Sequence, residues 1–159
     1  MDPKVQTKSK DEGRVISTNE VADALDVIQG CCLLHYPSKE LIGVQCQGVK
    51  HLLDHVLSQQ SVNVQLAALD CLLALMVDCN EVQNEFHAHK GLKTLVDLLK
   101  LKTVRSEVRH KIAAVVLFMT RYFNEQREEN KQRVQSLLGE KLTSALMQAV
   151  QLTNRTQDE

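Results

Sequence analysis

The pattern of apolar and polar positions predicts helices along most of this chain, because hydrophobic residues recur every three to four positions. The first helix opens at Ser17, and Glu20 follows at the spacing of a capping box. We expect this helix to run to about Leu34. Its predicted buried face consists of Val21, Leu25, Ile28, Cys32 and Leu33. Tyr36-Pro37-Ser38 is expected to end the helix and to cap the next one.

The same periodicity predicts the remaining helices. They are expected over residues 39–57, 61–79, 80–89, 92–101 and 105–123, followed by a charged helix from Asn124 and an apolar one over Leu142–Leu152. We expect the helix over 39–57 to divide at Gly48. The stretch 61–79 is apolar on most sides, so its helix should lie between two neighbours. The polar ends, residues 1–16 and 153–159, are predicted to be a disordered leader and tail, which leaves 17–152 as one helical domain.

An internal repeat joins these helices into a larger pattern. The segment 48–54 (GVKHLLD) lies over 91–97 (GLKTLVD) with Gly, Lys, Leu and Asp identical, 43 residues on. Asn80-Glu81 lies over Asn124-Glu125 at an offset of 44, and a weaker third copy begins at Gly139. Chance similarity among Leu-rich helices is the alternative to a true repeat. In the repeat reading, the glycine lets the chain turn sharply between two helices.

Periods of about 40–47 residues are those of HEAT and armadillo arrays. Each unit here reads as a short helix, a glycine break, a medium helix and a long helix, which is the armadillo order. We therefore predict an all-α fold, namely an armadillo/HEAT-like right-handed superhelix of two to three short repeats with capping helices at its ends.

A second pattern lies in the segment 86–123. Gly91-Leu92 opens a helix that ends in Leu98-Leu99-Lys100, and Val108-Arg109-His110-Lys111 begins a long helix with an aromatic-rich end at Tyr122-Phe123. This segment resembles the fungal septation-initiation-network (SIN) component that partners a germinal-centre-type kinase, a small armadillo-like protein. The resemblance implies a non-catalytic subunit that supports a kinase during cell division.

Composition narrows the function classes. The chain has 159 residues, a net charge of −1, no Trp and five cysteines. The absence of a basic excess disfavours nucleic-acid binding. The apolar run 66–77 is broken by Asp70 and is too short to span a bilayer. An odd number of cysteines, most of them in apolar helical patterns, indicates free thiols in a reducing compartment, so we expect a cytoplasmic protein, with the nucleus or cytoskeletal structures as alternatives.

The sequence contains no convincing catalytic set: there is no phosphate-binding glycine loop, nucleophile elbow or zinc-protease motif. We therefore expect a protein that is not an enzyme and that uses no cofactor or metal. His51 and His55 stand four residues apart, a spacing that can hold a metal, but further ligands are not evident and two exposed helix histidines are the preferred interpretation.

The densest basic cluster lies around residues 100–111. Arg side chains form forked bonds to carboxylates and phosphates, so this cluster is a candidate docking patch for an acidic or phosphorylated partner segment. The alternative is a solvated helix start with Glu107 as its internal counter-charge. The candidate partner-binding residues are Lys102, Arg105, Arg109, His110 and Arg121.

Together these features predict a protein-binding scaffold or adaptor, with a regulatory role towards a protein kinase in cell division or cytokinesis. The alternative is a structural subunit of a centrosomal, ciliary or cytoskeletal assembly, or a self-associating oligomer such as a homodimer, because a short array leaves apolar flanks at its ends.

Overall fold

The computed structural model describes residues 16–58, 61–122, 127–141, 143–145 and 148. Helices account for all of the regular structure in these ranges, and no strand occurs among them, which confirms the all-α prediction. No helix within the same ranges is long and apolar enough to cross a bilayer. The predicted leader apart from Ile16, the tail 153–159 and most of the predicted helix Leu142–Leu152 lie outside the described residues.

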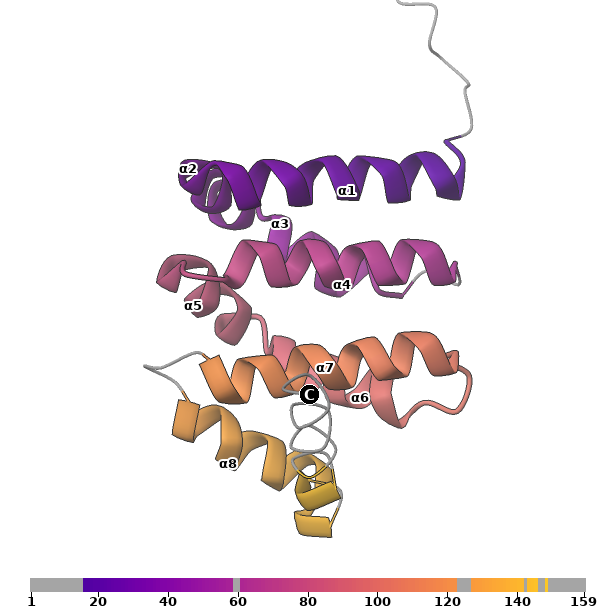
Figure 1. Cartoon of the computed structure of the whole chain (residues 1–159), viewed down its shortest axis with the longest axis vertical. Coiled ribbons are helices and arrows are strands. Elements are labelled where there is room, and N and C mark those ends of the chain that lie inside the picture. The colour runs from indigo at the N-terminus through magenta and orange to yellow at the C-terminus, as the bar shows by residue number, and fades with distance from the viewer. Residues whose placement is uncertain (1–15, 59–60, 123–126, 142, 146–147, 149–159) are drawn as a thin grey trace, which may run out of the picture.

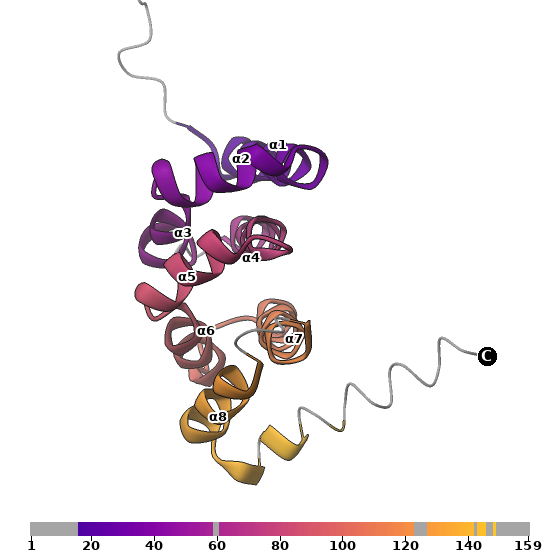
Figure 2. The same cartoon turned by 90° about the vertical axis from the view of Figure 1, so that its left-hand side faces the viewer.

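Three long helices form one layer of the molecule. They lie side by side in Figure 1 and are seen nearly end-on in Figure 2. They begin at residues 18, 62 and 106, which is 44 residues at each step. These helices are α1 (Thr18–Leu34), α4 (Val62–Met76) and α7 (Ser106–Tyr122).

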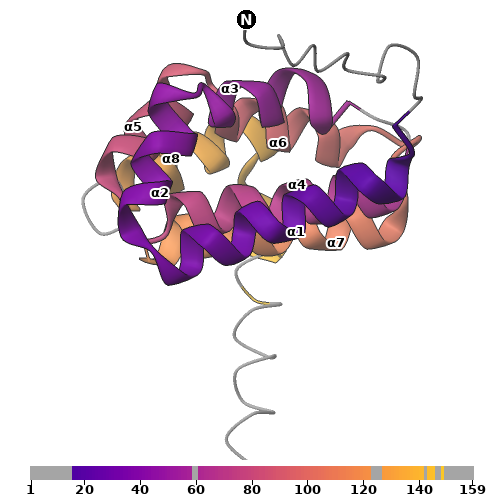
Figure 3. The same cartoon turned by 90° about the horizontal axis from the view of Figure 1, so that it is seen from above.

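Shorter elements form a second layer, which is seen beside the first when the stack is viewed from above (Figure 3). In chain order they are α2 (Tyr36–Glu40), the π-helical segment η1 (Leu41–Gln45), α3 (Gly48–His51), the π-helical segment η2 (Leu52–Val56), α5 (Asn80–Ala88), α6 (Gly91–Lys100) and α8 (Arg127–Leu138). A short, a medium and a long helix therefore follow one another twice, from α2 to α4 and from α5 to α7.

The start of α1 follows the predicted capping box. The Ser17 hydroxyl accepts the backbone N–H of Glu20 at 3.3 Å, and the Glu20 carboxylate accepts the backbone N–H of Ser17 at 2.9 Å. Leu25 and Cys32 are buried as expected. Leu33 is 59% exposed, so its predicted place in the buried face is wrong, because it projects about 80° away from Leu25 around the helix.

The helix predicted over 39–57 differs most from the structure. It begins already at Tyr36, because Pro37 in the first turn lacks only an N–H that has no partner within the helix. Its first half ends at Gln45, and a second half begins at Gly48. Between them Gln47, not Gly48, adopts the left-handed backbone conformation. Lys90 does the same before Gly91.

The repeated glycine therefore serves a purpose other than the predicted sharp turn. A Cβ on Gly48 would stand 2.5 Å from the carbonyl oxygen of Ile42. A Cβ on Gly91 would stand 2.5 Å from Cζ of Phe86. Both glycines permit close packing at the start of a helix, while the preceding residue takes the positive φ.

Helix α4 forms the centre of the core. It packs between α1 and α7, which confirms that the most apolar stretch lies between neighbours. Most of its side chains are buried on every side, including Leu69, Leu72, Leu75 and Met76.

Two polar side chains from the second layer reach the carboxyl end of α4. The Lys39 ammonium on α2 donates to the carbonyl of Val77 at 2.5 Å, and the Gln83 amide on α5 donates to the carbonyl of Met76 at 2.9 Å. Lys39 and Gln83 stand 44 residues apart, at equivalent positions of the two repeats, and both are buried. The last carbonyls of a helix have no partner within it, so these donors satisfy groups that would otherwise be buried without hydrogen bonds.

Candidate docking site

The predicted basic cluster is spread over the turn after α6 and the first turns of α7. Lys102 and Arg105 are exposed before the helix begins, and Arg109 and His110 are exposed on its first two turns. Arg121 lies near the far end of α7, and its side chain is outside the described part of the structure. The five candidates therefore do not form one patch.

A groove of about 370 Å³ brings Arg109 and His110 together with other elements. It lies where the end of α6, the start of α7 and the end of α8 meet. Its lining combines three side chains that are cationic or can become so with an apolar floor and one hydroxyl: Lys100, Arg109 and His110, then Leu99, Ala113 and Leu138, then Ser106. Neither Lys102 nor Arg105 is among these lining residues.

The Arg109 guanidinium is available for a ligand. Within the described part of the chain this side chain has no hydrogen-bond or ion-pair partner, whereas the Arg109 backbone N–H donates to the carbonyl of Arg105 at 3.0 Å. A guanidinium over an apolar floor suits a carboxylate or phosphate, because it offers two parallel N–H donors.

Glu107 is the acidic residue of α7 nearest in sequence to Arg109. Its carboxylate interacts with residues beside it in the sequence. Hydrogen bonds from its own backbone N–H and from the Ser106 hydroxyl, together with the charges of Arg105 and His110, hold the pKa of this carboxyl below its usual value. Glu107 is therefore ionised at neutral pH, and its charge lies near those of Arg105 and His110. It does not line the groove.

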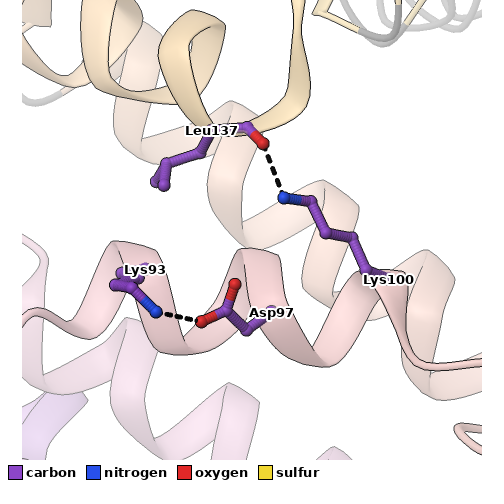
Figure 4. Close-up of polar contacts among 4 residues, drawn as sticks. All are labelled: Lys93, Asp97, Lys100 and Leu137. Carbon is purple, nitrogen blue, oxygen red and sulfur yellow. Dashed lines mark hydrogen bonds and ion pairs between the residues drawn. The ribbon is translucent and has the colours of Figure 1, made fainter.

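Lys100 has a structural tie as well as a charge. Its ammonium donates to the carbonyl of Leu137 at 2.6 Å, which joins the end of α6 to the last turn of α8 (Figure 4). A cation is favourable there because the last carbonyls of a helix carry partial negative charge. This bond positions Leu138 at the groove.

A second, smaller groove of about 200 Å³ lies at the other end of α6. Two of the three Lys and Arg side chains that line it, those other than Lys90, are engaged already: Lys93 pairs with Asp97 at 2.5 Å (Figure 4), and Arg133 pairs with Glu129 at 2.5 Å. Arg133 also contacts Nδ1 of His87 at 3.2 Å. This groove is therefore less suited to an acidic ligand than the groove at Arg109.

The other candidate chemistry lies apart from both grooves. The rings of His51 and His55 are exposed with centroids 5.5 Å apart, and no group of three or more His, Cys, Asp or Glu that could hold a metal occurs among the described residues. Burial raises the pKa of Cys71 to about 12 and raises that of Cys32, so neither thiol is an activated nucleophile.

Sequence reasoning missed Leu99 and Leu138, which form much of the apolar floor. Nothing local marks them, since each reads as an ordinary apolar position of an amphipathic helix. Only the packing of α6 against α8 brings them beside Arg109.

Comparison with known proteins shows which protein family the chain belongs to. The protein family described as Cell division control protein 14, SIN component, matches residues 7–159. The chain belongs to this family. The resemblance in segment 86–123 is thus confirmed at the level of the SIN-component family, which points to a role in cell-division signalling and to protein partners. Searches of curated proteins and of solved structures gave no match.

Proposed function

We propose that this SIN-family chain is a non-catalytic adaptor that binds an acidic or phosphorylated segment of a partner protein in the groove at Arg109. The observation that carries the proposal is the junction of α6, α7 and α8, where Arg109, His110 and Lys100 surround an apolar floor. Family membership supports a role in cell division, and the sequence resemblance supports a germinal-centre-type kinase as the partner.

The dimensions of the groove favour a peptide side chain with one apolar neighbour. Its volume is at the lower end of the range for ligand pockets. A phosphate or carboxylate would bond to Arg109 and lie near His110, while an adjacent apolar side chain would cover Leu99 and Leu138.

The fold that we propose for this adaptor is armadillo-like, with a right-handed superhelical stack. Its support is the 44-residue step between long helices and the recurring order of short, medium and long helices.

We further propose that the protein acts in the cytoplasm. Imaging of the tagged chain in dividing cells tests this placement.

Affinity purification from the native cell tests the docking groove. Wild-type protein should capture a kinase, and Arg109→Glu should reduce that capture about 10-fold or more, equivalent to about 1.4 kcal/mol. Arg105→Glu is the matched control, since it makes the same charge change one turn earlier on an exposed residue outside the groove. Phosphatase treatment of the lysate separates a phosphorylated segment from an acidic one.

Two results would count against the proposal. Equal loss in both variants would indicate long-range attraction by net charge and not binding in the groove. Equal capture by wild type and Arg109→Glu would remove the groove as the docking site. The measurement requires that both variants retain the helical circular-dichroism signal, which is expected because both residues are exposed.

A further inference from the structure

The hydroxyl group of Ser106 lies at the groove beside Arg109. Ser106 is exposed, is the first residue of α7 and is among the residues that line this groove. Arg109 and His110 follow it by three and four residues, so the three side chains share one face of the helix. A group added to the Ser106 oxygen would therefore stand within reach of both of these side chains.

Glu107 holds this hydroxyl in the unmodified chain. The Ser106 hydroxyl donates to the Glu107 carboxylate at 3.2 Å, and Glu107 does not line the groove. The same carboxylate accepts its own backbone N–H, which lowers its pKa further than the bond from Ser106 does. The hydroxyl is thus bonded to an ionised group outside the groove, and the Arg109 guanidinium stays available for an anion.

Two basic residues stand before Ser106 and do not line the groove. Lys102 and Arg105 precede it by four residues and by one, and both are exposed. Protein kinases select their substrates by such patterns of charge around the target residue. Ser106 also lies where a helix frays most readily, because the first N–H groups of a helix have no partner within it. The target hydroxyl is therefore accessible to an enzyme that recognises basic residues.

We propose that Ser106 is a phosphorylation site and that its phosphate closes the groove to an acidic partner segment. The enzyme is a protein kinase that recognises basic residues, and the phosphoryl donor is ATP. The Ser106 oxygen forms a bond to the γ-phosphorus, and the bond from this phosphorus to the β,γ-bridging oxygen breaks. ADP leaves, and the hydroxyl proton passes to the aspartate base of the kinase. The inference rests on the proposed function, because it concerns regulation of the same groove.

The phosphate reverses the local bonding. It carries a charge of about −1.5 to −2 at neutral pH, so the Glu107 carboxylate repels it where it formerly accepted a hydrogen bond. Arg109 attracts it with two parallel N–H donors, and the start of a helix favours an anion. The phosphate therefore turns from Glu107 to Arg109 and occupies the guanidinium that the partner segment requires.

A phosphorus NMR titration of the full chain tests this contact. Phosphoserine is incorporated at position 106 by genetic encoding, and its second ionisation, at about pH 6 when unperturbed, is followed. Arg109 favours the dianion, so the proton affinity of the phosphate should be about 3-fold or more lower than in an Arg109→Gln background. The matched control is phosphoserine in place of Thr103, an exposed residue outside the groove, whose titration should not respond to Arg109→Gln.

Capture of the kinase that wild-type protein retains tests the closure of the groove. Phosphoserine at position 106 should reduce this capture about 10-fold, as Arg109→Glu does. Phosphoserine in place of Thr103 adds the same charge outside the groove and should leave the capture intact.

Mass spectrometry of the chain isolated from dividing cells tests whether the modification occurs. Phosphate should be found on Ser106, and replacing Lys102 and Arg105 together by alanine should lower its occupancy about 3-fold or more. Detection of the unmodified Ser106 peptide alone at every stage of division would overturn the proposal. So would equal titration of the phosphate at position 106 with and without the Arg109 side chain.

The failure of this inference can be told apart from failure of the proposed function. If Arg109→Glu loses the kinase and phosphoserine at position 106 does not, the docking groove stands and its closure is overturned. If wild-type protein captures no kinase, the proposed function fails and closure falls with it. The titration and the mass spectrometry need no partner, so they decide in either case whether Ser106 is modified and engages Arg109.

Discussion

Replacement of Gly91 by alanine tests the close packing at the second repeat junction. The new Cβ would stand 2.5 Å from Cζ of Phe86 and nearer still to two other ring carbons. Carbon atoms in contact prefer about 3.5–4.0 Å, so the ring would have to move by about 1 Å or more. Phe86 is 1% exposed, and the surrounding core leaves it little room.

The cost follows from two opposing terms. Overpacking of a filled core costs about 1–3 kcal/mol. Replacing glycine by alanine in a helix recovers up to about 1 kcal/mol, and less at the first helical position. We expect Gly91→Ala to lower the free energy of unfolding by about 1–2 kcal/mol, which corresponds to a fall in Tm of roughly 2–8 °C for a chain of this size.

Urea denaturation followed by circular dichroism measures this difference. Gly30→Ala is the matched control, because nothing lies within 4 Å of its new Cβ inside α1. In dilute solution it should stabilise the protein by about 0.5–1 kcal/mol. Phe86→Leu should relieve the crowding. The loss of stability in the double variant Phe86→Leu/Gly91→Ala should therefore be about 1 kcal/mol smaller than the summed losses of the two single variants. If Gly91→Ala is as stable as wild type, the close approach to Phe86 is refuted.

Three further predictions concern the core, the thiols and the first helix cap. Leu72→Asp should abolish the cooperative melt, because it buries a charge without a partner in α4 where Leu72 is fully buried; a normal melting curve would contradict the core assignment. At pH 8 a thiol reagent should modify the exposed Cys31 and Cys46 rapidly and Cys71 only after unfolding, because burial raises the pKa of Cys71 to about 12; rapid reaction of Cys71 would contradict its burial. The hydrogen bonds of the capping box lower the pKa of Glu20, so its stabilising effect is present above the unfolded-state value of 4.5 and is lost as the pH falls through the lower folded-state value. The difference in Tm between wild type and Glu20→Ala should therefore shrink on acidification, and a constant difference would exclude this linkage.

The helices were largely predictable because their signals are local. Ser17 and Glu20 mark the first cap, and the periodic apolar residues of α1, α4 and α7 require no knowledge of the fold. The repeat was also visible in the sequence, since the close packing at Gly48 and Gly91 restricts both positions in the same way.

The less predictable features depend on tertiary contacts. The π-helical segments after Glu40 and His51 carry no sequence signal that distinguishes them from α-helix. The groove was predictable only in part: Arg109 and His110 stand out by charge, whereas the place of Leu138 depends on the bond between Lys100 and the end of α8.

The two donors at the end of α4 have a consequence for how the molecule opens. Lys39 belongs to the preceding short helix and Gln83 to the following one, so separating either from α4 exposes a carbonyl that had a protein partner. Neighbouring units of a helical array normally couple through apolar contact, and here the elements before and after the central helix add a polar coupling. Hydrogen exchange in α2, α4 and α5 should therefore proceed through one shared opening event, in which these three elements lose protection together.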